Sequence, residues 1–78
     1  MKRETWKQVD ISGLAIGDVV RVGLKAYRGE AGRLHNGRVG VVKLIRYGDV
    51  IVRPMGDDRW YTEDVHHPPY KLEKKVIA

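Results

Sequence analysis

Basic side chains that could bind a polyanion are concentrated in the middle of this 78-residue chain. Between residues 21 and 53 there are eight lysines and arginines but only two acidic residues, a net charge of +6. The rest of the chain has seven basic and eight acidic residues, a net charge of −1. Cationic side chains that neutralise phosphates supply most of the sequence-independent affinity of nucleic-acid-binding proteins. The charge distribution therefore predicts a surface for nucleic acid.

Tyrosines within or beside this basic stretch could add stacking on unpaired bases, worth about 1–3 kcal/mol per base. We expect Tyr27, in a loop, and Tyr47, in a turn, to be exposed. Because the chain has no phenylalanine, Trp60 is expected in the core and Tyr61 on the opposite face. The candidate nucleic-acid-binding residues are Lys25, Tyr27, Arg28, Arg33, Arg38, Lys43, Arg46 and Tyr47. The alternative is that the same stretch is only a solvated charged face.

Residues for catalysis are few. Asp57-Asp58 and Glu63-Asp64 are paired carboxylates, but adjacent residues in a turn point in different directions, and turns favour Asp for backbone reasons. The chain has no cysteine and no Ser/His/Asp arrangement at a glycine-rich elbow. The segment from Gly29 to Gly32 lacks the Lys-Ser/Thr pair of a phosphate-binding loop. We therefore predict a protein that is not an enzyme and uses no cofactor.

Histidines offer only a weak metal site. His66 and His67 are adjacent and His35 is distant in sequence, whereas a zinc site needs three or four converging ligands. We expect a solvated His-His pair before Pro68 and no bound metal.

The elements that would position these residues are strands. Apolar residues alternate at Val20, Val22 and Leu24, as a half-buried strand requires. In the run 39–45, Val42 and Leu44 share one face, which we expect to line the core. The segment 46–49 reads Arg-Tyr-Gly-Asp and predicts a tight turn into a strand over 50–52, which Pro54 ends. The central element is therefore a β-hairpin.

The flanking segments complete the predicted fold. Residues 59–62 continue the meander, residues 63–65 form one helical turn, and residues 70–73 alternate again and pair with the first strand. A long loop of about residues 25–36 follows that first strand. The prediction is an all-β, SH3-like small barrel of about five strands over 13–73. Residues 1–12 are expected to be loosely ordered, although Trp6 or Val9 could dock on the barrel, and residues 74–78 to fray.

The length and composition of the chain indicate its number of domains and its location in the cell. Seventy-eight residues allow one domain with a small core. The charged start of the chain is unlike a signal peptide, and the chain has no run of about 18 apolar residues that could cross a membrane. It also has no cysteine, so nothing in the sequence indicates an oxidising compartment. We expect a cytoplasmic protein with no membrane partner.

Two stretches resemble known modules. The run Gly17-Asp-Val-Val-Arg-Val22, followed by Gly37-Arg-Val-Gly-Val-Val42, resembles the KOW motif of SH3-like barrels in ribosomal proteins and transcription elongation factors. The stretch from Gly37 to Val65 is similar to the small barrel repeats of Mind bomb-type and HERC-type ubiquitin ligases. The first resemblance implies nucleic-acid binding and the second implies peptide recognition.

Three hypotheses follow from the sequence. The preferred one is a DNA- or RNA-binding module that uses the basic loop and hairpin. The second is a protein-interaction module, in which an acidic peptide lies between the long loop and the turn at residues 55–58. The third is an assembly subunit that joins a larger complex through an exposed sheet edge.

Overall fold

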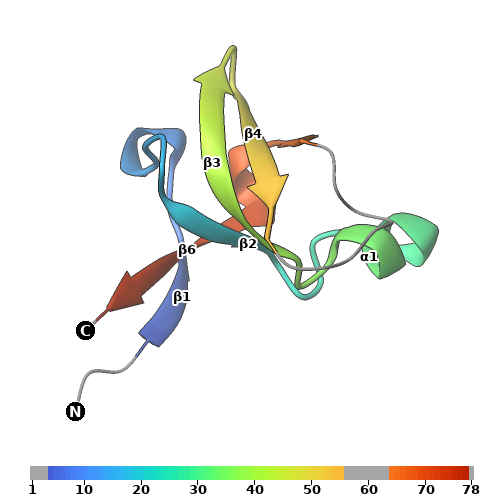
Figure 1. The fold of residues 1–78 in the computed structure, drawn as a ribbon. Coiled ribbons are helices and arrows are strands. Elements are labelled where there is room, and N and C mark those ends of the chain that lie inside the picture. The colour runs from blue at the N-terminus through green and yellow to red at the C-terminus, as the bar shows by residue number, and fades with distance from the viewer. Residues whose placement is uncertain (1–3, 56–63, 78) are drawn as a thin grey trace.

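A computed structural model describes residues 4–55 and 64–77 of the chain (Figure 1). Six antiparallel strands form one sheet in the order β1-β6-β2-β3-β4-β5. The strands are β1 (Glu4–Gln8), β2 (Val19–Val22), β3 (Val39–Arg46), β4 (Asp49–Pro54), β5 (Val65–His67) and β6 (Leu72–Ile77). One α-helix, α1 (Gly29–His35), and two 3₁₀ turns, η1 (Ile11–Gly13) and η2 (Pro69–Lys71), complete the described elements. The predicted all-β class is confirmed.

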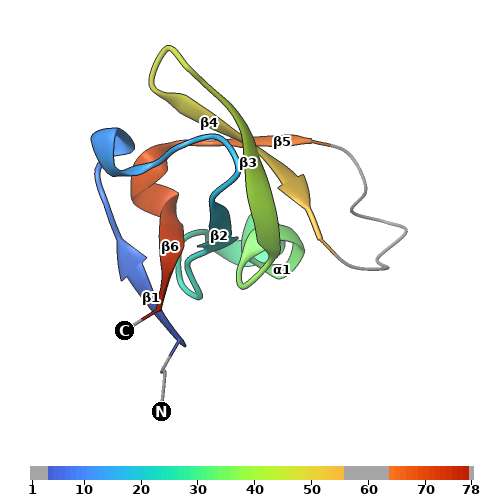
Figure 2. The same ribbon diagram turned by 60° about the vertical axis from the view of Figure 1, so that its left-hand side comes forward.

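The strand pairing leaves the sheet open, with β1 and β5 at its two edges. The hydrogen-bonded order therefore does not close the predicted barrel. The sheet is nevertheless strongly curved, and the β3–β4 hairpin rises above the layer formed by β2 and β6 (Figures 1 and 2).

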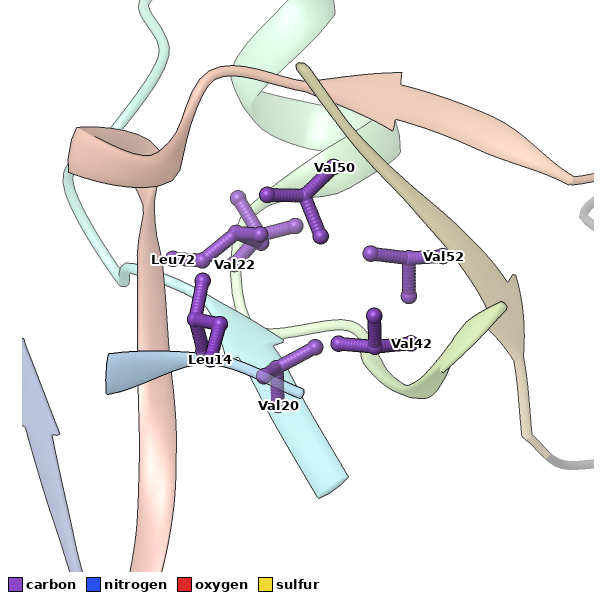
Figure 3. Packing of buried hydrophobic residues seen from close by; sticks show 7 residues of the cluster. All are labelled: Leu14, Val20, Val22, Val42, Val50, Val52 and Leu72. Atoms are coloured by element: carbon purple, nitrogen blue, oxygen red, sulfur yellow. The ribbon is translucent and has the colours of Figure 1, made fainter. Parts of the chain in front are cut away.

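The core is one small apolar cluster inside this curve (Figure 3). Inward residues of four strands and one connecting segment meet there: Leu14, Val20, Val22, Val42, Val50, Val52 and Leu72. A flat sheet could not bring β4 and β6 into one cluster, because β2 and β3 lie between them. Curvature of the sheet is thus what allows so short a chain to bury these side chains.

The β3–β4 hairpin has the predicted turn. Arg46 pairs with Asp49, and the two residues between them have positive φ, 49° at Tyr47 and 80° at Gly48. Positive φ at both central residues defines a type I′ turn, whose twist matches that of the flanking strands. β4 ends at Pro54, also as predicted.

A β-bulge in β3 corrects the predicted core face. Val42 pairs with Val52 but Leu44 pairs with Ile51, so Lys43 is the extra residue and the alternation of faces shifts. Val42 is 1% exposed, whereas Leu44 is 40% exposed. Leu44 was therefore wrongly assigned to the core. Leu24 is also exposed, because β2 ends at Val22.

The predicted long loop contains a helix. Residues 29–35 form α1, which has no buried residue. The Tyr27 backbone N–H donates to Asn36 Oδ1 at 3.0 Å, and Asn36 Nδ2 donates to the Tyr27 carbonyl at 2.9 Å. This reciprocal pair closes the base of the segment and holds the two ends of α1 together.

Paired strands extend into both end segments of the chain. β1 lies within the segment expected to be loosely ordered, and β6 runs through the segment expected to fray, because the two strands pair from Glu4↔Ile77 to Gln8↔Glu73. The Arg21 guanidinium lies 4.9 Å from the centre of the Trp6 ring, so Trp6 does dock on the sheet. β6 also pairs with β2, as predicted for the last strand.

Two further predictions concern residues 59–65. The strand expected at 59–62, with Trp60 and Tyr61, lies outside the described residues. A helical turn at 63–65 is wrong for its described part, because Val65 begins β5. The helical turn of this region is instead η2, where Pro69 supplies the fixed φ of a first helical position.

Candidate functional site

The turn of the hairpin presents an aromatic ring and a cation to solvent. Tyr47 is 93% exposed, the largest fraction among the exposed large hydrophobic residues of the described chain. The Arg46 guanidinium carbon lies 5.4 Å from the centre of the Tyr47 ring. Tyrosine rarely occupies a position with positive φ, which usually favours Gly, Asn or Asp. The Tyr47 ring is thus exposed to solvent and is not a packing residue of the core.

Strand pairing brings four more side chains to one patch beside the ring. Asp49 and Ile51 are two residues apart on β4, so they share a face. Arg46 is the partner of Asp49 across the hairpin, and His66 is the partner of Ile51 on β5. Cross-strand partners lie on the same face, so all four converge.

These residues surround a small hollow. Its volume is about 120 Å³, and it is lined by Arg46, Tyr47, Asp49, Ile51 and His66. Ile51 provides an apolar surface, while the other four provide an aromatic ring and polar or charged groups. Leu44, the partner of Ile51, and the exposed bulge residue Lys43 lie next to this patch. We call the six residues Lys43, Arg46, Tyr47, Asp49, Ile51 and His66 together the hairpin site.

The other predicted basic residues lie at the opposite end of the hairpin. Lys25, Arg28 and Arg33 are exposed in or beside α1. Arg38 is half-buried and its Nε donates to the Leu34 carbonyl at 3.1 Å. Strand β3 begins next to α1 and ends at the turn (Figure 1). Its eight residues span about 23 Å at the usual rise of a β-strand. The predicted set is thus two groups rather than one patch.

Two arginines of the +6 stretch are neutralised by acids. Arg21 Nε is 2.8 Å from Glu73 Oε1, and Arg53 Nε is 3.1 Å from Asp64 Oδ1. Asp64, which pairs with Arg53, belongs to the Glu63-Asp64 pair of carboxylates noted in the sequence. Glu63 and the Asp57-Asp58 pair lie outside the described residues.

Tyr27 is not the free stacking ring that the sequence predicted. It packs against the core cluster, and its hydroxyl lies 2.7 Å from His67 Nδ1. Burial, and to a smaller extent Tyr70, raises the pKa of Tyr27. Its ring also has Lys71 Nζ 4.8 Å from its centre. Tyr27 is therefore a structural contact between the α1 segment and β5.

His67 is likewise not solvated as predicted, because it is only 1% exposed. Burial, with smaller contributions from His35 and His66, lowers the pKa of His67 from 6.5 to about 4. The His35 and His67 rings meet edge to face, 5.2 Å between centres, and burial lowers the pKa of His35 as well. Within the described residues there is no group of three His, Cys, Asp or Glu side chains that could hold a metal ion.

Sequence reasoning missed three members of the hairpin site: Asp49, Ile51 and His66. Asp49 and Ile51 could have been placed beside Arg46 from the turn alone, since a two-residue hairpin fixes the register. His66 could not, because the strand that pairs with β4 was expected at residues 59–62, whereas β5 begins at Val65. The peptide groove predicted beside residues 55–58 lies mostly outside the described residues.

Comparisons with protein-family models, with curated proteins and with solved structures found no match. In the ranges 4–55 and 64–77, no helix is both long and apolar enough to cross a membrane.

Proposed function

We propose that this chain is a nucleic-acid-binding domain that binds through its hairpin site. The observation that carries the proposal is the nearly fully exposed Tyr47 ring beside Arg46 and a small hollow, with Lys43 exposed on the same hairpin. An exposed ring can stack on an unpaired base, and adjacent cations can contact the phosphates on either side of it. Arg46 and Lys43 have no ion pair described within residues 4–55 and 64–77, so their charges remain available.

The α1 group, defined as Lys25, Arg28 and Arg33, is the second part of this proposal. These three cations lie about one strand length from Tyr47, at the other end of β3. A short nucleic-acid strand bound at the hairpin site does not reach the α1 group, whereas a longer nucleic-acid strand contacts both the hairpin site and the α1 group. Affinity should therefore rise with strand length and fall steeply with salt.

We also propose that the curved sheet is an SH3-like small barrel. The single core shared by β2, β3, β4 and β6, and the return of β6 to β2, support this proposal. Absence of enzymatic activity and a cytoplasmic location stay predictions from the sequence.

The direct test is fluorescence anisotropy with a labelled single-stranded oligonucleotide at about 50 and 200 mM salt. Tyr47→Ala should weaken binding about tenfold, because stacking on one base contributes about 1–3 kcal/mol. Arg46→Ala should weaken binding and reduce its salt dependence, because one phosphate contact is lost.

Two matched variants control for charge and for aromatic surface. Arg53→Ala removes the same charge from the same hairpin, but from a side chain already paired with Asp64. Tyr70→Ala removes an exposed ring from η2. Both should change affinity less than threefold. Equal losses in all four variants, or no binding at the lower salt, would contradict the proposal.

A further inference from the structure

The hollow of the hairpin site contains an acid, which simple attraction of phosphates does not explain. Asp49 is exposed at the start of β4 and lines the hollow together with Arg46 and His66. A carboxylate repels phosphates, so at a phosphate-binding turn it lowers generic affinity. For the part of the chain that the structure describes, no hydrogen bond or ion pair of the Asp49 carboxylate is found. Its oxygens are therefore able to accept hydrogen bonds from a ligand.

The chemistry of the hollow suits the edge of one planar ring. The apolar side chain of Ile51 and the Tyr47 ring line it together with the Asp49 carboxylate, and its volume is about 120 Å³. Resting on the proposed function, we propose that the hollow binds a single unpaired guanine base. Tyr47 stacks on the base, and the two oxygens of Asp49 accept hydrogen bonds from its edge.

Guanine is favoured by the arrangement of its donors. Its N1–H and its N2 amino group lie side by side on the Watson–Crick edge, so one carboxylate can accept from both. Adenine and cytosine have one amino group next to a ring nitrogen acceptor, which would face the second carboxylate oxygen. Thymine and uracil have one N–H between two carbonyl oxygens, which the carboxylate repels. The Asp49 side chain thus gives base specificity to a surface that otherwise reads only charge and stacking.

The base must be unpaired for this contact. In a duplex the Watson–Crick edge of guanine is already hydrogen bonded to cytosine, and its ring is enclosed in the stack. A base that enters a hollow of this size has to be turned out from its neighbours, which is least costly in a single strand. The proposed ligand is therefore single-stranded DNA or RNA that contains guanine.

The test compares oligothymidine strands of equal length with and without one central guanine, each labelled for fluorescence anisotropy. Wild-type protein should bind the guanine-containing strand about tenfold more tightly, the size expected for one bidentate base contact. Asp49→Asn should reduce this preference to less than twofold, because an amide has only one acceptor oxygen. Its binding to oligothymidine should be strengthened, since a carboxylate that repels phosphates is removed.

Asp10→Asn is the matched control. It makes the same change of charge at an exposed residue that caps η1 without a side-chain hydrogen bond. It should keep the tenfold preference for guanine. Thermal melting of both variants near the wild-type temperature would show that neither change alters the fold.

The possible failures are distinguishable. Salt-dependent binding with equal affinity for all strands, or a guanine preference that survives Asp49→Asn, would overturn the base assignment and leave the proposed function in place. Tighter binding of a duplex than of the guanine-containing single strand would also overturn the base assignment. Absence of binding to every strand at low salt would overturn the proposed function itself.

Discussion

Acidification should destabilise this protein through one buried histidine. His67 is 1% exposed, and burial lowers its pKa from 6.5 to about 4 in the folded chain. In the unfolded chain the same imidazole takes up a proton near pH 6.5. As the pH falls below 6.5, the unfolded state binds a proton that the folded state excludes, so the free energy of unfolding decreases. The loss is complete below about pH 4.

The size of this effect follows from the pKa difference. One pKa unit corresponds to about 1.4 kcal/mol, so the shift from 6.5 to about 4 amounts to a full loss of about 3 kcal/mol. About 2 kcal/mol of it falls between pH 7 and pH 5, where carboxylates contribute little. Burial lowers the pKa of His35 too, so its contribution has the same sign. For so small a domain, this is a large part of the total stability.

Urea unfolding followed by tryptophan fluorescence at pH 7 and pH 5 would measure this loss. His67→Asn keeps a polar group near Tyr27 but cannot titrate, so its stability should change much less between the two pH values. His66→Asn replaces the exposed neighbour and should keep the wild-type pH dependence. A wild-type stability that is equal at pH 7 and pH 5, or a His67→Asn variant with an undiminished pH dependence, would refute the reasoning.

Three further predictions concern packing and the second basic group. Val42→Ala should lower the free energy of unfolding by about 2–4 kcal/mol, whereas Leu44→Ala should cost less than about 1 kcal/mol because the bulge turns Leu44 outward; equal losses in urea unfolding would contradict the bulge. Gly40→Ala should melt well below wild type, since a Cβ there would lie 2.5 Å from the Arg53 carbonyl oxygen; a wild-type melting temperature would show that β4 can move aside. The double change Arg28→Ala and Arg33→Ala should weaken binding of a strand of about 15 nucleotides but not of about 5, as measured by anisotropy. Equal affinity for the longer strand would remove α1 from the interface.

The sequence predicted those parts of the fold that depend on neighbouring residues. Alternation identified β2, and the Arg-Tyr-Gly-Asp segment identified the hairpin turn, because turn type follows from which residues tolerate positive φ. The bulge at Lys43 was not predictable in this way. It is a property of the pairing between β3 and β4, and it changed the assignment of Leu44.

The α1 segment and Tyr27, which connects it to β5, were also beyond what the local sequence could predict. The seven residues of α1 bury no side chain and show no apolar periodicity in the sequence. The segment was therefore predicted to be a loop. Tyr27 was assigned to the binding surface because its partner, His67, is 40 residues away in the chain. For the candidate site, Lys43, Arg46 and Tyr47 were found from sequence, while convergence with His66 required the position of β5.

The central claim is that nucleic acid binds at the hairpin site, and an NMR titration tests it most directly. Amide resonances of ¹⁵N-labelled protein would be followed while a guanine-containing single strand of about 5 nucleotides is added. The account predicts the largest shifts at Arg46, Tyr47, Asp49 and His66, with α1 unaffected by so short a strand. Shifts confined to α1, or to the outer edge of β1, would contradict it.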